Sequence, residues 1–194
     1  MTSKHNTLHV VMPIVCALFS IVFLSSALAA PSTSSKIDIK AKDIRGSDLT
    51  KEECLQKIRS VQLSKDFRGA KMDEVDISGA NLTAADLSDA SLKKSILKGA
   101  KLSRADLTRA NLEGAILYQA DLSNAKLANA NLKNANLTNA NLQKALMIGA
   151  NLNKAVLIEA NLSGANLTGA TMEGAKTNGA VFSGTIMPDG QIHP

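Results

Sequence analysis

Aromatic residues are scarce in this sequence, which has no Trp, one Tyr and four Phe among its 194 residues. Proteins that bind single-stranded nucleic acid stack bases on several exposed rings set among basic side chains. Basic residues outnumber acidic ones by only 22 − 17 = 5, and they form no long run. Composition therefore favours neither nucleic acid nor an anionic membrane surface as a partner.

Histidine and cysteine are also few, with three and two copies. Of these five residues, only Cys54 and His193 lie outside the first 29 residues. Ser-His-Asp, Cys-His and metal-binding arrangements need several such groups to converge. We therefore expect no enzyme activity, no catalytic residue, no cofactor and no metal site. If residues 1–29 are removed as a signal peptide, as argued next, Cys54 is the one remaining cysteine and no intramolecular disulfide can form. We interpret Cys54 as a small buried residue on a helix.

The N-terminus carries the only long apolar run, Val10 to Ala30, which follows Lys4 and ends in Ala27-Leu28-Ala29. This pattern predicts a signal peptide over residues 1–29, followed by a polar linker over 30–36. Its length also suits an uncleaved membrane anchor, although Pro13 weakens that alternative. We expect export to the periplasm or the extracellular space, or to a thylakoid lumen in a photosynthetic organism. No membrane association is expected after cleavage.

An internal repeat of five residues runs from Lys65 to Gly184. The third residue of almost every pentad is apolar, and the first is usually Ala. In an α-helix a period of five would spiral these residues around the axis, and in a flat strand it would alternate them between the two faces. One interior can receive them all only if the backbone bends once per pentad. The sequence therefore predicts a coiled, all-β solenoid.

Both ends of the array differ from its middle. Residues 37–64 contain two degenerate pentads, Lys42 to Gly46 and Ser47 to Lys51, and then a helix-like pattern between Thr50 and Leu63. We expect this segment to cap the first coil with a short helix, because an open solenoid end exposes core and unpaired backbone. Residues 185–194 are predicted to form a C-terminal tail.

The pentads Ala120-Asp121-Leu122-Ser123-Asn124 and Ala130-Asn131-Leu132-Lys133-Asn134 match the A(D/N)Lxx consensus, and the chain thereby resembles the pentapeptide-repeat family. The resemblance implies a right-handed quadrilateral parallel β-helix with four pentads per coil. Twenty-four pentads would give six coils, with a length of about 29 Å at the sheet spacing. Residues 20 apart would then stack, as the shared character of Asp66, Asp86 and Asp106 suggests.

One predicted side breaks the polar character of the outside. Apolar residues occupy positions that elsewhere carry Asn, Asp, Ser, Thr or Lys, and Asn136 and Thr138 interrupt them. A patch of this kind marks a protein contact or self-association, although β-branched residues also suit extended walls for structural reasons alone. The candidate contact residues are Ile96, Ile116, Tyr118, Val156 and Ile158.

Three hypotheses about function follow. The leading one is a non-enzymatic, exported scaffold that binds an unidentified protein. The family resemblance supplies the second, a DNA mimic that shields gyrase from quinolones, which the basic charge and the export signal disfavour. A third, an enzyme built on the Asp66, Asp86 and Asp106 column, has little support, because carboxylates near Arg68 and Arg109 are better interpreted as solvated turn residues.

Overall fold

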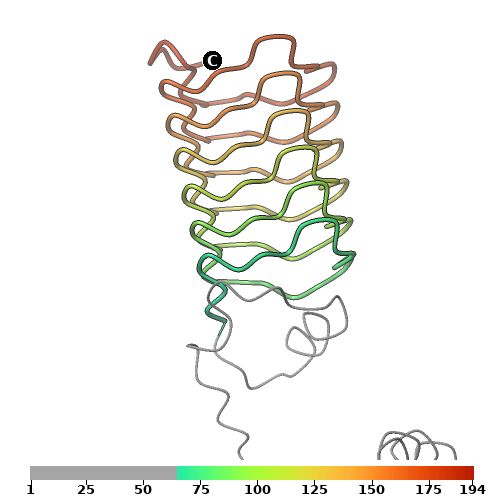
Figure 1. The fold of residues 1–194 in the computed structure, drawn as a ribbon. Coiled ribbons are helices and arrows are strands. Elements are labelled where there is room, and N and C mark those ends of the chain that lie inside the picture. Colours follow the sequence, from blue (N-terminus) through green and yellow to red (C-terminus); the bar gives the residue numbers. More distant parts are fainter. Residues whose placement is uncertain (1–64) are drawn as a thin grey trace, which may run out of the picture. The chain divides into compact units, whose positions relative to one another are not determined.

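The computed structural model describes residues 65–194. The predicted signal peptide, linker and N-terminal cap, including Cys54, lie outside the described residues. From Lys65 onward the chain winds into stacked coils (Figure 1). The second residue of each pentad forms a parallel β-bridge with the residue 20 positions later, from Asp66 with Asp86 to Asn166 with Ile186. Four pentads complete one coil, so the predicted four-sided parallel solenoid is confirmed.

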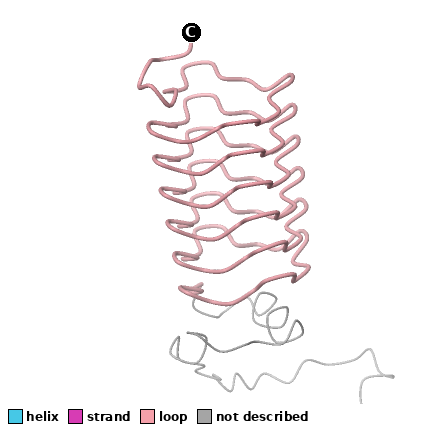
Figure 2. Cartoon of the chain, turned by 45° about the horizontal axis from the view of Figure 1, so that its top comes forward, coloured by secondary structure: helices cyan, strands magenta, loops and turns pink. Residues whose placement is uncertain are grey.

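Within residues 65–194 the structure contains no helix, and each pentad contributes a single bridge residue rather than a longer strand (Figure 2). We number the sides of the coil by their first pentads. Side 1 begins at Lys65, side 2 at Ala70, side 3 at Val75 and side 4 at Ala80. Side 1 is therefore opposite side 3.

A tight turn separates each pentad from the next. The N–H of the following pentad's first residue donates to the carbonyl oxygen of the third residue, as from Ala70 to Phe67 at 3.0 Å. The fifth residue has positive φ at every turn, whether it is glycine, as at Gly169 (φ 67°), or not, as at Ala84 (φ 56°). This is the geometry of a type II turn. For a non-glycine residue this conformation costs roughly 1–2 kcal/mol, which the surrounding coils must offset.

Hydrogen bonds between coils use three of the five backbone N–H groups in a pentad. Asp106 N donates down to Ala85 O at 2.8 Å, whereas Leu107 N and Arg109 N donate up to Lys126 O at 2.7 Å and Ala128 O at 2.9 Å. The first residue's N–H closes the turn. In the inner coils of the described solenoid, only the N–H of the fourth residue is left without a backbone acceptor.

A side chain satisfies this remaining N–H where the second residue is Asp or Asn. Thr108 N donates to Asp106 Oδ1 at 3.0 Å, and Thr138 N donates to Asn136 Oδ1 at 3.0 Å. We call this bond the pentad cap, and it gives a physical reason for the Asp/Asn preference at the second position. The same bond is made to the N–H of Arg68, Ser78, Thr83, Ser88, Glu113, Ser123, Lys133, Gln143, Asn153, Ser163 and Thr168.

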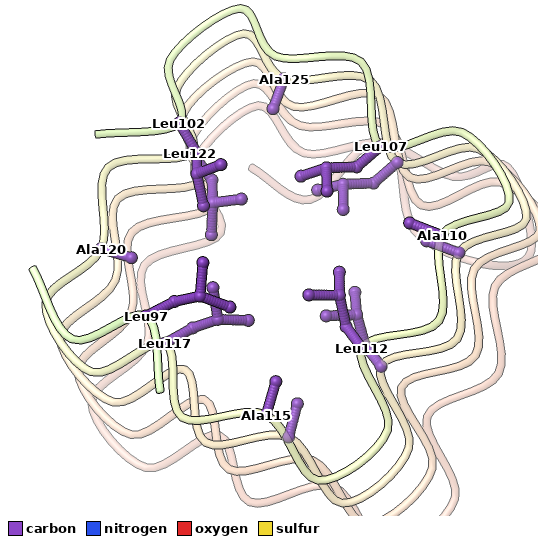
Figure 3. Close-up of a cluster of buried hydrophobic side chains, with 14 of the residues drawn as sticks. Leu97, Leu102, Leu107, Ala110, Leu112, Ala115, Leu117, Ala120, Leu122 and Ala125 are labelled. Carbon is purple, nitrogen blue, oxygen red and sulfur yellow. The ribbon is translucent and has the colours of Figure 1, made fainter. Parts of the chain in front are cut away.

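The core is a column of third-position leucines and first-position alanines, which point inward from all four sides (Figure 3). Leu107 and Leu127, like most of their equivalents, are completely buried. Burial of each leucine contributes about 1.5–3 kcal/mol. Ser95 replaces one alanine, and its Oγ donates to Leu92 O at 2.6 Å. No buried side-chain nitrogen or oxygen within residues 65–194 lacks a hydrogen-bond partner.

The C-terminal residues continue side 1 and then reverse. Thr185 is buried, and its Oγ1 donates to Leu162 O at 2.7 Å. Ile186 forms a parallel bridge with Asn166 below it and an antiparallel bridge with Ile192. His193 N donates to Thr185 O at 2.8 Å. Residues 185–194, the predicted tail, therefore form a reversal that extends side 1 and also accepts a hydrogen bond from Gly184 N, at the end of side 4, at 2.9 Å.

Candidate protein-contact surface

All five candidate contact residues lie on side 3. Ile96, Ile116 and Val156 occupy second positions, and Tyr118 and Ile158 occupy fourth positions of the same column of pentads. Parallel bridges join Ile96 to Ile116, Ile116 to Asn136 and Asn136 to Val156. We call these five residues the side-3 apolar surface. Their role in binding stays a prediction, but the fold stacks them on one side as the period of 20 predicts.

The side-3 apolar surface is only partly accessible. Ile116 is 39% exposed, whereas Ile96, Tyr118, Val156 and Ile158 are half-buried. Neighbouring side chains in the stack cover part of each of them. Accessibility alone therefore does not distinguish a contact surface from residues that pack along the wall.

The hydrogen bonds of side 3 show what these apolar residues replace, and in the described coils the same cap is missing on other sides where the second residue is Lys or Leu, as in the pentads of Lys101 and Leu146. Because isoleucine and valine cannot accept a hydrogen bond, their pentads lack the cap. The N–H groups of Lys98, Tyr118 and Ile158 have no acceptor among residues 65–194, whereas Thr138, in the coil between them, is capped by Asn136 at 3.0 Å. An intramolecular hydrogen bond contributes about 0.5–1.5 kcal/mol net. The apolar side chains therefore replace a residue type that would stabilise the turn.

Charged side chains lie at the edges of this surface. Lys98 Nζ is 5.8 Å from the centre of the Tyr118 ring, a cation–π distance. Lys176 bridges to Val156 from the last coil, and its side chain is exposed. The surface is thus a narrow apolar column with charges of both signs near each end, Lys98 and Asp76 at one end and Lys176 and Glu159 at the other.

Side 1 carries the aspartate column, and its carboxylates have cationic partners. Arg68 donates to both oxygens of Asp66, at 2.8 and 2.6 Å, and its Nε lies 3.6 Å from Asp86 Oδ2. Lys126 Nζ lies 3.3 Å from Asp106 Oδ2. No group of three or more His, Cys, Asp or Glu side chains in the described part of the chain has the arrangement of a metal site.

These interactions shift the pKa of several side-1 groups. Hydrogen bonds from Arg109 at 2.7 and 2.6 Å lower the pKa of Asp89 below its usual range. Partial burial opposes ionisation of Asp106, but hydrogen bonds from Thr108 and Lys126 outweigh it and lower this pKa too. Hydrogen bonds to Asp66 and Asp89 raise the pKa values of Arg68 and Arg109, respectively. A lowered carboxyl pKa suits a permanent ion pair and does not suit a general acid.

The basic residues of the second coil are spread over several sides. Lys93 and Lys94 lie on side 2, Lys98 lies on side 3, and Lys101 and Arg104 lie on side 4. Lys93 and Lys94 also approach Glu113 and Glu74, each at 3.7 Å. The cations therefore lie on three of the four sides, and no single side presents them together.

Sequence reasoning missed one exposed apolar pair. Leu146 and Ile148, at the second and fourth positions of one side-1 pentad, are each 45% exposed, more than any residue of the side-3 apolar surface. Their neighbours 20 residues away are Lys126, Ala128, Asn166 and Thr168, so no stacked apolar column indicates them. Reading the second and fourth positions of each pentad as a pair would have found them.

The geometry defines a four-sided β-solenoid built from pentads. The family model "Pentapeptide repeats" matches the chain in eight copies over residues 65–89, 85–124, 115–153, 135–174 and 165–189. These matches cover more than half of the chain, which therefore belongs to the pentapeptide-repeat family. Proteins of this family form right-handed β-helices and are generally non-enzymatic scaffolds.

Several solved structures are similar to this chain. The pentapeptide repeat protein Rfr23 of the cyanobacterium Cyanothece 51142 is 29% identical, with a TM-score of 0.51, over 65% of this chain and 97% of that protein. HetL of Nostoc sp. strain PCC 7120, which is involved in heterocyst differentiation regulation, is 36% identical over 66% of this chain and 68% of its own, with a TM-score of 0.36.

A third similar structure is a pentapeptide repeat protein of the Arabidopsis thaliana thylakoid lumen, 31% identical over 61% of this chain and 68% of that protein, with a TM-score of 0.39. No curated protein matches this sequence. Within residues 65–194 no helix is long and apolar enough to cross a membrane. The comparisons thus establish the family and leave function to be argued from this chain's own surface.

Proposed function

We propose that this protein is an exported, non-enzymatic scaffold that binds another protein through the side-3 apolar surface. One observation supports this proposal above the others. Ile96, Ile116 and Val156 stand where an Asp or Asn would cap the turn, and the N–H groups of the fourth residues in these pentads have no acceptor in the described part of the chain. A sequence selected only for stability would favour the cap.

Packing of the apolar side chains along side 3 gives no energetic advantage over the hydrogen bond that the missing cap would make. A favourable cross-strand pair such as Ile96 with Ile116 contributes roughly 0.2–1 kcal/mol, and a cap contributes a comparable or larger amount of about 0.5–1.5 kcal/mol. The apolar choice also leaves Ile116 more than a third exposed to water. A partner that buries these side chains would recover the difference.

The column indicates what the partner presents. Its apolar side chains recur at the spacing of the coils, about 4.8 Å, with a gap at Asn136 and Thr138. A matching partner presents two groups of apolar side chains, one that contacts the residues before Asn136 and one that contacts the residues after Thr138. Acidic groups at its rim would face Lys98 and Lys176. Side 3 of this chain itself carries Asp76 below Ile96 and Glu159 beside Ile158, so self-association is the alternative to a different protein, and the identity of the crosslinked species distinguishes the two.

Export rests on the sequence alone. The apolar run from Val10 to Ala30 and the small residues of Ala27-Leu28-Ala29 have the form of a secretory signal. Fractionation of the source cells, with N-terminal sequencing of the purified protein, tests this part of the proposal. A mature chain that begins at Ala30 in an exported fraction would support it, and a cytoplasmic chain that retains Met1 would contradict it.

Gyrase binding as a DNA mimic is less consistent with the surface. Such a protein needs an acidic outside that resembles phosphate spacing. Here the side-1 carboxylates Asp66, Asp89 and Asp106 have cationic partners within 3.3 Å. Their charge is neutralised locally, and the whole chain carries a net charge of +5.

The test of the contact places a photocrosslinking residue at position 118 of the full-length protein in its native cells. The polar position 123 on side 4 is the matched control, since Ser123 also occupies a fourth position and is also half-buried. We expect an adduct at 118 and none at 123. A third probe at the exposed position 148 asks whether side 1 makes the contact instead.

A second variant distinguishes a specific contact from proximity. Ile158→Asp puts a carboxylate on the half-buried outer surface and leaves the core unchanged. We expect it to abolish the adduct at position 118 while the free energy of unfolding changes by less than about 1 kcal/mol. An adduct that persists in this variant, or one that forms equally at position 123, would refute the side-3 contact.

A further inference from the structure

Asn178-Gly179 is the only Asn-Gly dipeptide in the sequence. It forms the fourth and fifth positions of the last turn on side 3, and both residues are exposed. In a dipeptide of asparagine followed by glycine, the backbone nitrogen of glycine can attack the side-chain amide carbon of asparagine. This reaction is fastest before glycine, because glycine has no side chain to hinder the approach of the nitrogen. The main protection in a folded protein is a backbone that holds this nitrogen away from the amide carbon.

The Asn178-Gly179 peptide group is held on one side only. Glu159 N donates to Asn178 O at 2.9 Å from the coil below. Gly179 N–H has no acceptor among residues 65–194, because no pentad stacks above it on side 3. In inner coils the equivalent N–H is always engaged, as where Gly99 N donates to Tyr118 O at 2.9 Å.

Two other sites in the same fold show the contrast. Asn153-Lys154 occupies the same turn positions on side 2, and its peptide group is held on both sides, by Asn134 N at 3.0 Å below and Glu173 O at 2.8 Å above. Asn153 Oδ1 also accepts from Glu173 N at 2.9 Å. Asp189-Gly190 has its glycine N–H engaged with Met187 O at 2.9 Å.

We propose that Asn178 is a site of spontaneous deamidation in the folded protein. Gly179 N attacks Cγ of Asn178, a new C–N bond closes a cyclic succinimide, and the side-chain nitrogen leaves as ammonia, taking up the proton that Gly179 N loses. Water then opens the succinimide at either carbonyl. The products are aspartate, or isoaspartate in which the main chain runs through the former side chain. No enzyme, oxidant or cofactor is required.

Conversion changes the end of side 3. Asn178 lies 20 residues after Ile158 in the same column, and the bond from Glu159 N places it directly above the side-3 apolar surface. Either product adds one negative charge there. Isoaspartate also lengthens the main chain by a methylene group and so displaces the carbonyl that accepts from Glu159. The site is independent of the proposed function, since it follows from the last coil's backbone alone.

The experiment compares two Asn-Gly sites in one chain. Lys154→Gly creates a second Asn-Gly site, at Asn153, in an inner turn whose fifth residue already has a φ of 60°, so glycine fits there without strain. The purified full-length variant is incubated at mildly alkaline pH, folded and in urea, and both sites are followed by peptide mass spectrometry and by isoaspartyl methyltransferase labelling. Asn178→Ser, which matches Ser78 at the same column position, removes the reactive amide as a control.

We expect both sites to react at similar rates in urea. In the folded chain we expect Asn178 to react roughly tenfold or more faster than Asn153, because rotation of the inner peptide group must break an additional hydrogen bond and open a coil. Asn178→Ser should lose the label at this site. Equal protection of the two sites in the folded chain, or an intact Asn178 under conditions that convert it in urea, would overturn the proposal.

Discussion

At the second position of each pentad, a single side chain determines both how the turn is capped and what the outside presents. Asn136 caps Thr138 N and offers a polar group to solvent. Ile116, one coil earlier in the same column, does neither, and Tyr118 N is left to solvent or to a partner. Stability and binding are thus expected to oppose each other at this position.

This opposition predicts a mutation with opposite effects on stability and binding. Ile116→Asn should cap Tyr118 N and raise the free energy of unfolding by about 0.5–1 kcal/mol. The same change should reduce or abolish the crosslink at position 118, because it removes the most exposed residue of the side-3 apolar surface. Denaturant titration and the crosslinking yield measure the two effects.

The reverse substitution is the matched control. Asn136→Ile should destabilise the protein by a similar amount and fill the gap in the apolar column, which should increase the crosslinking yield. If Ile116→Asn instead destabilises the protein and leaves the crosslink intact, wall packing is the better explanation of the apolar column.

At the scale of the pentad, the third and fifth positions of one repeat face opposite environments. Leu127 is completely buried, whereas Asn129 lies two residues later at an exposed turn with a φ of 57°. Leu127→Asp should cost about 4 kcal/mol or more, because it buries a carboxyl group without a partner and empties part of the core. Asn129→Asp should be nearly neutral, since aspartate tolerates this turn conformation. Urea titrations that give the two variants equal stability would contradict the inward and outward assignment.

Pairs of pentads on side 1 are linked by charge as well as by backbone. The folded-state pKa of Asp89 is lowered by Arg109, so the unfolded chain binds protons more readily at acid pH. The stability from this pair is present above the ordinary aspartate pKa and is lost as the pH falls through the lower folded-state value. Asp89→Asn should therefore lower the stability slightly at neutral pH, leave it unchanged at a pH below the folded-state pKa, and so flatten the acid limb of a stability-against-pH profile. An unchanged acid limb would mean that the ion pair contributes nothing to folding.

Across the whole described solenoid, the period of five predicts the coil, and the period of 20 predicts which residues share a side. Both follow from sequence because every Leu must reach one interior. Exposure could not be predicted in the same way, since it depends on stacked neighbours. Ile96 and Val156 are partly covered in their column, whereas Leu146 and Ile148 protrude between smaller or polar neighbours. The C-terminal reversal from Thr185 to His193 was missed because its bonds join residues outside the repeat pattern.

Because all four sides share one core pattern, the solenoid should tolerate deletions of whole pentads, and the length of the deletion should set which columns stay aligned. Removal of residues 125–144 takes out one full coil, keeps Val156 and Ile158 on side 3 and places Val156 directly after Ile116 in the bridge register. Removal of residues 125–134 takes out half a coil and moves Val156 and Ile158 to side 1, opposite Ile116. Each deletion leaves every remaining pentad with its buried residues, so both variants should fold. The larger deletion should lose more stability, because repeat stability is roughly additive.

Circular dichroism and thermal unfolding check folding, and the crosslink at position 118 checks binding. We expect the full-coil deletion to keep or strengthen the crosslink and the half-coil deletion to lose it. If both folded variants crosslink equally, binding does not require the side-3 column, and the contact must involve Ile116 and Tyr118 alone or another side.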